Sequence, residues 1–250
     1  MKFPYTLKRR SIWKQYKRYE QSYRALELLR SSPLEGPEGG GVAKFLSAYD
    51  QAHSERLQEI FALLNNSFQK DGFFVEFGAL DGITLSNTWL LETDYNWHGI
   101  LAEPAKFCHE ALKQNRNCHI DTRCIWRESG ERILFNEHTS TGLSGIVATL
   151  ARPVRRVSNK QRTYHVETLS LNDLLSAYSA PSYINYISID TEGSEFEILN
   201  AFDFNRHRFG CLSIEHNFCA QRERIYALLT SHGYKRVCEE ISGVDDWYVA

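Results

Sequence analysis

The stretch Phe73-Phe-Val-Glu-Phe-Gly-Ala-Leu-Asp-Gly82 decides the fold of this chain. Four of its first five residues are aromatic or β-branched and turn residues flank the run, which predicts a short buried strand over Phe73–Phe77. The strand leads into a tight glycine turn, after which we expect a helix over Thr84–Glu92. Strand, glycine turn and helix in this order are typical of a doubly wound α/β sheet, which binds ligands beyond the carboxyl ends of its strands.

An acid before the glycines indicates which ligand this turn suits. A dinucleotide site carries G-x-G-x-x-G, whereas this turn has the wider pattern Glu76-x-Gly78-x-x-x-Gly82. The carboxylate of Glu76 would accept hydrogen bonds from an ammonium group and would repel a pyrophosphate. The pattern therefore favours S-adenosylmethionine, whose methionine part carries an amino group and a sulfonium, over a nicotinamide dinucleotide.

The bulk composition is that of a globular chain. Its 250 residues, 42% hydrophobic and 24% charged, suffice for one α/β domain and an extension. No run of 18 apolar residues occurs, and the start of the chain lacks the apolar segment of a signal peptide. The six cysteines form no C-x-x-C pair, which favours reduced thiols over a disulfide framework or a zinc site. We therefore expect a cytoplasmic protein.

The charge is divided unevenly along the chain. Residues 1–30 hold nine Lys and Arg against Glu20 and Glu27, a net +7, so the remaining 220 residues carry −9 of the overall −2. An acidic body argues against nucleic acid as a partner. Within the basic segment, apolar residues recur at helical spacing and form one stripe: Ile12, Tyr16, Tyr19, Tyr23 and Leu26.

Two interpretations of this helix compete. In one, residues 8–30 make a peripheral contact with anionic lipid or with an acidic partner. In the other, the tyrosine stripe packs on the domain and the basic face is solvated. We expect the second, because tyrosine inserts into membranes less readily than leucine or tryptophan.

A glycine- and proline-rich linker over residues 31–41 divides the basic segment from the rest. A second helix is predicted over Val42–Gln69, with Leu57, Ile60, Phe61 and Leu64 on its buried face. The chain is thus predicted to have a helical extension over residues 1–70 and an α/β domain over 71–250.

Strands and helices alternate through the second part. The predicted strands are His98–Ala102, Cys118–Ile125, Glu131–Asn136, Tyr164–Thr168, Tyr183–Asp190 and Phe209–Glu215, followed by a closing hairpin at Val237 and Val244–Val249. The predicted helices are Ala105–Asn115, a helix capped by Asn172 that runs to Tyr178, Ser194–Ala201 and Gln221–Ser231. This alternation predicts a mainly parallel sheet with right-handed crossovers.

Acids stand at the ends of four predicted strands, at Glu76, Glu103, Asp190 and Glu215. Because ligands gather at this edge of such a sheet, we expect the four to converge on one crevice. Glu103 comes 27 residues after Glu76, where an acid can bind both ribose hydroxyls of a nucleoside. Asn87 either reaches the carboxylate of the methionine part or belongs with Ser86 and Thr88 to a helix cap.

The segments Asp190-Thr-Glu192-Gly193 and Glu215-His216-Asn217 supply an acceptor side. Acids and a histidine at neighbouring strand ends can hold a divalent cation, or can take the proton of a hydroxyl group. The Ser-, Thr- and Arg-rich insertion over residues 139–162 is either a lid that contacts an anionic acceptor, through Arg152, Arg155, Arg156, Lys160 and Arg162, or a solvated loop.

Taken in order, the motifs FFVEFGALDG, SNT, NWHGILAEP, SGERILF, LNDLL, ISIDTEGSEFEIL and LSIEHN resemble the FkbM family of S-adenosylmethionine-dependent methyltransferases over about Phe73–Asn217. The resemblance implies a class I (Rossmann-like) methyltransferase sheet with an antiparallel last strand, and O-methylation of sugar or polyketide hydroxyls. It places Glu76, Gly78, Asp81, Gly82 and Glu103 at the cofactor, and Asp190, Glu192 and Glu215-His216 at the acceptor. Related sugar O-methyltransferases hold Mg²⁺ on acids at these strand ends; here Asp190 and Glu215 are the candidates, and His216 replaces the second acid.

The leading hypothesis is an O-methyltransferase acting on a hydroxyl of a glycan, a sugar or a related metabolite, with Asp190, Glu192 and His216 as catalytic residues. The alternative is a non-catalytic adaptor with a methyltransferase fold that works through its basic N-terminal helix at a membrane or an acidic partner. The presence of Glu76, Gly78, Gly82 and Glu103 argues for the enzyme.

Overall fold

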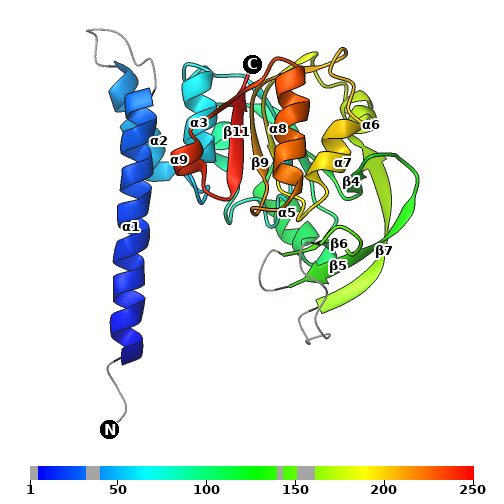
Figure 1. The fold of residues 1–250 in the computed structure, drawn as a ribbon, viewed down its shortest axis with the longest axis horizontal. Helices are drawn as coiled ribbons and strands as arrows, with labels where there is room; N and C mark the ends of the chain where they lie inside the picture. The colour runs from blue at the N-terminus through cyan, green and yellow to red at the C-terminus, as the bar shows by residue number, and fades with distance from the viewer. Residues whose placement is uncertain (1–4, 32–39, 140–142, 151–160) are drawn as a thin grey trace.

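A seven-stranded sheet forms the centre of a computed structural model, which describes residues 5–31, 40–139, 143–150 and 161–250 (Figure 1). The strand order is β10-β11-β9-β8-β1-β2-β3, in which β11 pairs antiparallel with β9 and β10 and the other pairs are parallel. The predicted mainly parallel sheet with an antiparallel last strand is confirmed. The strands are β1 (Phe73–Phe77), β2 (His98–Ala102), β3 (His119–Asp121), β8 (Tyr183–Ile189), β9 (Arg208–Glu215), β10 (Lys235–Val237) and β11 (Asp245–Val249).

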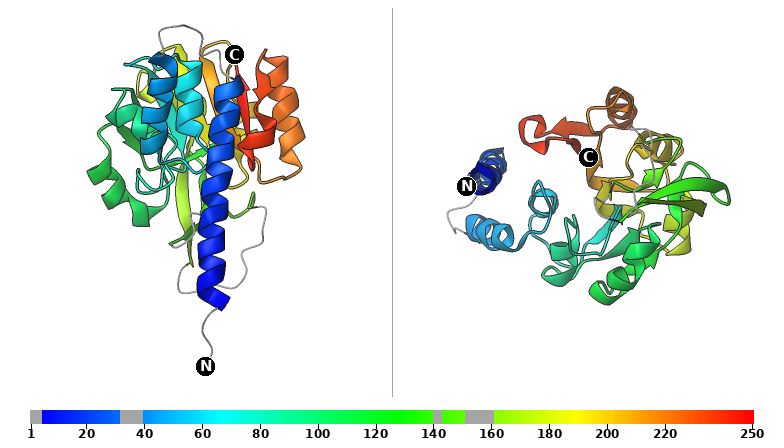
Figure 2. Two further views of the ribbon diagram at one scale, coloured as in Figure 1. Left: turned by 90° about the vertical axis from the view of Figure 1, so that its left-hand side faces the viewer. Right: turned by 90° about the horizontal axis from the view of Figure 1, so that it is seen from below.

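Helices cover both faces of this sheet (Figures 1 and 2). Neighbouring residues of β1 point to opposite faces, so Phe74 enters one hydrophobic core and Val75 the other. The core that contains Val75 includes residues of the helices α6 (Leu171–Ala177), α7 (Glu195–Asn200) and α8 (Gln221–Ser231). The core that contains Phe74 includes residues of α1 (Tyr5–Ser31), α2 (Gly40–Gln51), α3 (Gln58–Asn65), α4 (Trp89–Thr93) and α5 (His109–Asn115). Two short helices, η1 (Lys106–Cys108) and α9 (Glu239–Ser242), complete the fold.

A second, four-stranded sheet lies beside the first, in the order β4-β7-β5-β6. Its strands are β4 (Cys124–Trp126), β5 (Arg132–His138), β6 (Gly145–Ile146) and β7 (Gln161–Ser170). The single strand predicted over Cys118–Ile125 is wrong, because β3 pairs with β2 while β4 pairs with β7. The chain turns between them where Asp121 accepts hydrogen bonds from the backbone and side chain of Arg123.

The N-terminal region differs from its prediction in two respects. The helix predicted over Val42–Gln69 is two helices, α2 and α3, separated by a break that ends at Leu57, whose φ of 70° is left-handed. The tyrosine stripe of α1 is not its packed face: Tyr19 and Tyr23 are 71% and 42% exposed. Leu28 and Ala25 make the contact with the domain instead. Most of the linker predicted over 31–41 lies outside the described residues.

Two further helix starts shift for local reasons. The helix after the glycine turn begins at Trp89 rather than Thr84, because residues before it bond to the carboxylates of Asp81 and Glu76. Helix α6 is capped by Ser170, whose hydroxyl accepts from the backbone N–H of Asp173, and not by Asn172. Within the described residues, no helix has the length and apolar composition that crossing a bilayer requires.

Candidate active site

A cavity of about 430 Å³ lies beyond the carboxyl ends of β1, β2, β8 and β9. Its position is the ligand-binding edge of a doubly wound sheet. The lining residues come from the turns after these strands and from the second sheet: Glu55, Glu76, Phe77, Gly78, Leu80, Thr84, Leu85, Asn87, Ala102, Glu103, Pro104, Cys124, Ile125, Phe135, Leu143, Ser144, Gly145, Ile146, Asp190, Thr191, Glu192, Ser194 and Glu215. All four strand-end acids of the sequence analysis are among them.

Gly78 is where the backbone of the first turn meets that of β8. Its φ is +81°, and a Cβ at this position would lie 2.3 Å from the backbone oxygen of Asp190. Only glycine adopts this φ without strain and leaves room for the neighbouring backbone. Gly78 therefore holds the side of the cavity that Glu76 lines against the side that contains Asp190.

Glu76 anchors the segment that follows the glycine turn. Its side chain is almost fully buried, and its oxygens accept hydrogen bonds from the backbone N–H of Asn87 and from the hydroxyls of Ser86 and Thr88. Ser86 and Thr88, which the sequence suggested as helix caps, thus donate their hydroxyl hydrogen bonds to Glu76. The carboxylate still borders the cavity.

Arg116 contacts Glu76 and the residues that bond to it, a role that was not predicted from the sequence. Its side chain is fully buried, lies 2.5 Å from Oε2 of Glu92 and 3.9 Å from Oε2 of Glu76, and donates to the hydroxyls of Ser86 and Thr88. An arginine after a helix carries no sequence signal for such a role, because the partners lie far away along the chain. Arg116 neutralises two buried acids and so stabilises the loop at the cavity.

Glu103 directly follows β2 and is 3% exposed. Its oxygens accept from the backbone N–H groups of Leu80 and Ala105, which leaves further lone pairs on both oxygens. Burial raises the pKa of Glu103 to about 7, against the lowering effect of the two backbone donors. The structure thus fixes a carboxyl group at the position from which the sequence predicted contact with ribose hydroxyls.

The other cofactor candidates divide between the cavity and its support. Asn87 lines the cavity, donates to the hydroxyl of Ser188, and leaves its side-chain oxygen without a hydrogen-bond partner. Asp81 accepts from the backbone of Ile83 and Thr84 and shapes the turn. Gly82 packs on Arg116. Unlike Asn87, Asp81 and Gly82 do not line the cavity.

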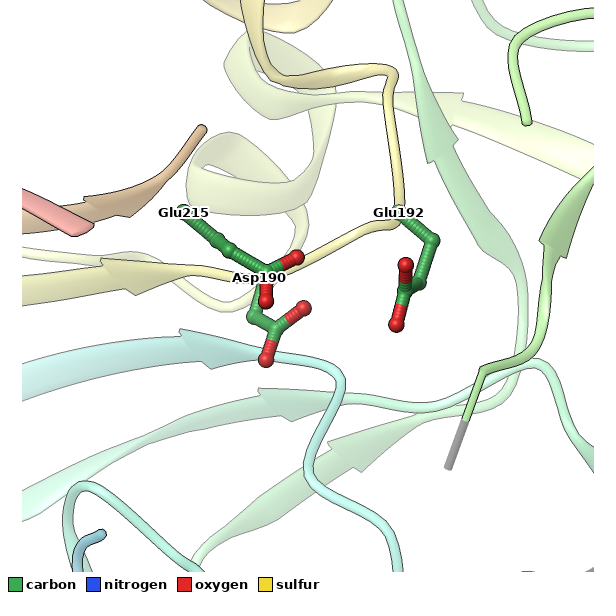
Figure 3. A group of neighbouring side chains, drawn as sticks. All are labelled: Asp190, Glu192 and Glu215. Atoms are coloured by element: carbon green, nitrogen blue, oxygen red, sulfur yellow. The ribbon is translucent and has the colours of Figure 1, made fainter. Parts of the chain in front are cut away.

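Three carboxylates form the opposite wall (Figure 3). Asp190 and Glu192 follow β8 and Glu215 ends β9, and ligand oxygens from the three lie within 4.8 Å of one another. The backbone of Glu192 has a φ of 59°, a strained conformation for a residue with a side chain. In Figure 3 the carboxylates of Asp190 and Glu215 lie side by side and that of Glu192 faces them.

Burial and mutual repulsion control the protonation of this wall. The pKa of Asp190 is raised, first by burial and then by the charge of Glu192. The pKa of Glu215 is raised as well, first by burial and then by the charge of Asp190. A proton shared by Asp190 and Glu215 would relieve the repulsion, and so would a divalent cation. Clustered carboxylate oxygens are the ligands that Mg²⁺ prefers, so the residues present fit such an ion.

His216 turns away from the cavity, and the predicted catalytic contact needs correction on this point. It is 2% exposed, its Nδ1 accepts from the backbone N–H of Phe218, and its Nε2 lies 3.6 Å from Asp246. Burial lowers the pKa of His216, against the raising effect of Asp246. Glu215, the last residue of β9, lines the cavity, whereas His216, the residue after the strand, points to Asp246.

The insertion and the N-terminal region also reach the cavity. Residues 143–146, on β6 and just before it, line the cavity, as does Glu55. Glu55 forms an ion pair with Lys17 of α1 at 3.1 Å. The basic run from Arg152 to Lys160 lies outside the described residues, and Arg162 lies on β7, so the anionic-acceptor lid stays a prediction.

The described cysteines are all free thiols, as expected.

Comparison with known proteins assigns the chain to a class and a family. A doubly wound sheet with an antiparallel last strand and a cavity at its carboxyl edge defines a class I methyltransferase fold. The methyltransferase FkbM domain model matches residues 76–236, more than half of the chain. The chain therefore belongs to the FkbM methyltransferase family, whose members are S-adenosylmethionine-dependent enzymes. No curated protein matches it.

The solved structures that match this chain include two methyltransferases. Precorrin-6y C5,15-methyltransferase from Geobacter metallireducens GS-15 is 12% identical with a TM-score of 0.41, over 72% of this chain and 71% of that one. The human methyltransferase 10 domain containing protein is 10% identical with a TM-score of 0.40, over 78% of this chain and 80% of that one.

Proposed function

We propose that this methyltransferase transfers its methyl group to a hydroxyl oxygen of a sugar, a glycan or a related metabolite. The observation that supports this acceptor is the wall formed by Asp190, Glu192 and Glu215 across the cavity from Glu103. A wall of carboxylates repels anionic acceptors and accepts hydrogen bonds from hydroxyl groups.

The two sides of the cavity divide the work. When bound, S-adenosylmethionine supplies a methyl group made electrophilic by a positively charged sulfur. Glu103 suits the ribose hydroxyls, and the turn held by Gly78 and Glu76 suits the methionine part. On the other side, Asp190 orients the acceptor hydroxyl, and a carboxylate oxygen of Glu192 takes its proton as the new carbon–oxygen bond forms and the methyl–sulfur bond breaks, which releases S-adenosylhomocysteine. His216, which faces away from the cavity, is left out of this step.

A divalent cation fits the same wall, and we propose Mg²⁺ held by Asp190 and Glu215. The ion would orient an acceptor oxygen and lower the pKa of its hydroxyl. Removal of metal with EDTA and restoration with Mg²⁺ tests this. Full activity in EDTA would leave Asp190 and Glu215 as a proton-sharing pair and refute the metal.

The substitutions Asp190→Asn and Glu192→Gln test the acceptor side. We expect turnover, measured as S-adenosylhomocysteine released from a panel of neutral sugars and glycans, to fall at least about 100-fold. Affinity for S-adenosylhomocysteine, measured by calorimetry, should stay within a factor of about three because the cofactor half is intact. Glu223→Gln, at an exposed acid on α8, is the matched control. Unchanged turnover in both cavity variants would refute the proposed mechanism.

A further inference from the structure

Helix α1 has two faces with different surroundings. Leu28 and Ala25 are 2% and 8% exposed and belong to the core under the sheet. Arg24 is also buried and is paired with Glu20 at 2.7 Å, and Lys17 reaches Glu55 on the domain. These residues fix the helix, and hence the direction of its other side.

The opposite side carries an exposed apolar stripe, which we call the tyrosine face: Tyr16, Tyr19, Tyr23 and Leu26. These side chains are 53%, 71%, 42% and 59% exposed. Their spacing of three and four residues places them on one side of the helix, and at 100° per residue that side lies roughly opposite Ala25 and Leu28. The stripe therefore points away from the domain.

The middle of α1 lies at the rim of the cavity, with the tyrosine face on the side of the helix that points away from the domain. In Figures 1 and 2, the N-terminal half of the helix extends past the body on the same side as β5 and β7. The ion pair of Lys17 with Glu55, a residue that lines the cavity, joins the middle of the helix to the cavity rim. A surface that contacts the tyrosine face thus lies beside the entrance to the site.

We infer that the tyrosine face docks on an anionic lipid surface. Charge selects this occupant: residues 1–30 carry a net +7 while the rest of the chain carries −9. An anionic bilayer attracts the helix and repels the body, which orients the domain with the helix toward the lipid. A second copy of the helix would bring two segments of +7 together, and repulsion disfavours that pairing.

The chemistry of the face also suits the interfacial region of a bilayer. Tyrosine has an apolar ring and a polar hydroxyl, and it concentrates at the level of the lipid headgroups. The docked helix lies along the surface, and the domain, attached through Leu28 and Ala25, stays on the water side.

The test is flotation of the full chain with vesicles of phosphatidylcholine mixed with phosphatidylglycerol, and with vesicles of phosphatidylcholine alone. We expect binding to the anionic vesicles only, with loss at high salt. The triple variant Tyr19→Ser, Tyr23→Ser and Leu26→Ser should bind at least about tenfold less tightly. The control Phe107→Ser with Tyr183→Ser removes aromatic residues of similar exposure, 43% and 49%, from the domain.

Three outcomes would overturn the inference. The first is no binding of the wild-type chain to anionic vesicles, and the second is equal binding of the triple variant. The third is a dimer in analytical ultracentrifugation that the triple variant abolishes, which would make the tyrosine face a self-association surface. Circular dichroism melting establishes that the variants are folded. Since binding is measured without acceptor or cofactor, its failure is distinct from failure of the proposed methyl transfer.

Discussion

The substitution Gly78→Ala tests the close approach that joins the two halves of the cavity. Its added Cβ would lie 2.3 Å from the backbone oxygen of Asp190, about 1 Å inside ordinary contact. The backbone fixes the position of the Cβ and the oxygen is itself a backbone atom, so no side-chain rotation can relieve the contact. Separating them costs about 1–3 kcal/mol as an overpacked contact. The left-handed φ of +81° adds about 1–2 kcal/mol for a residue with a Cβ.

The chain offers a matched control for the second cost alone. Gly130 has a φ of +83°, and a Cβ placed there meets no atom within 4 Å. Gly130→Ala should therefore lower the free energy of unfolding by only about 1–2 kcal/mol, and Gly78→Ala by about 2–5 kcal/mol. The entropy that alanine removes from the unfolded chain is the same in both variants and cancels in the comparison.

Chemical denaturation and calorimetry with S-adenosylhomocysteine measure the two effects. We expect Gly78→Ala to weaken binding at least about tenfold, because the turn can no longer sit against β8, and Gly130→Ala to leave binding unchanged. Equal stability and equal binding of the two variants would contradict this expectation. That result would mean that the turn and β8 separate without cost.

Other buried groups give further predictions. Arg116→Met removes the cation that pairs with Glu92 and Glu76, and it should lower the free energy of unfolding by about 3–5 kcal/mol. The control is Lys113→Met, which removes an exposed cation from α5. Equal melting temperatures of the two variants would contradict the role given to Arg116. Stability should also depend on pH: the pKa values of Glu59 and Glu103 are raised to about 7, mainly by burial, from an ordinary 4.5. Between these values the folded state binds more protons than the unfolded state. The free energy of unfolding should therefore fall as pH rises from about 4.5 to 7, by on the order of 3 kcal/mol per group, and level off above. Melting without ligand across this range checks the sign, and a melting temperature that rises over it would contradict the assignment.

Local sequence pattern was sufficient for the sheet and for the position of its ligand edge. Phe73–Phe77 is buried on both sides, so its apolar run and the glycine turn after it identify a central strand without knowledge of its neighbours. Acids that follow such strands must meet at one edge, because parallel strands end together. That geometry brought Glu76, Glu103, Asp190 and Glu215 to one cavity.

Only the tertiary structure decided which way the side chains face and which charged groups pair. The periodicity of α1 gave a stripe but could not tell whether Tyr19 faces the domain or solvent, because amphipathic spacing is the same in both cases. The position of His216 directly after β9 did not show that its ring contacts Phe218 and lies beside Asp246 instead of lining the cavity. Arg116 meets Glu92 and Glu76 across 24 and 40 residues of chain, a contact that no local pattern encodes. Spacing along the sequence reports what a segment can bury, whereas packing between distant segments decides what each charged group contacts.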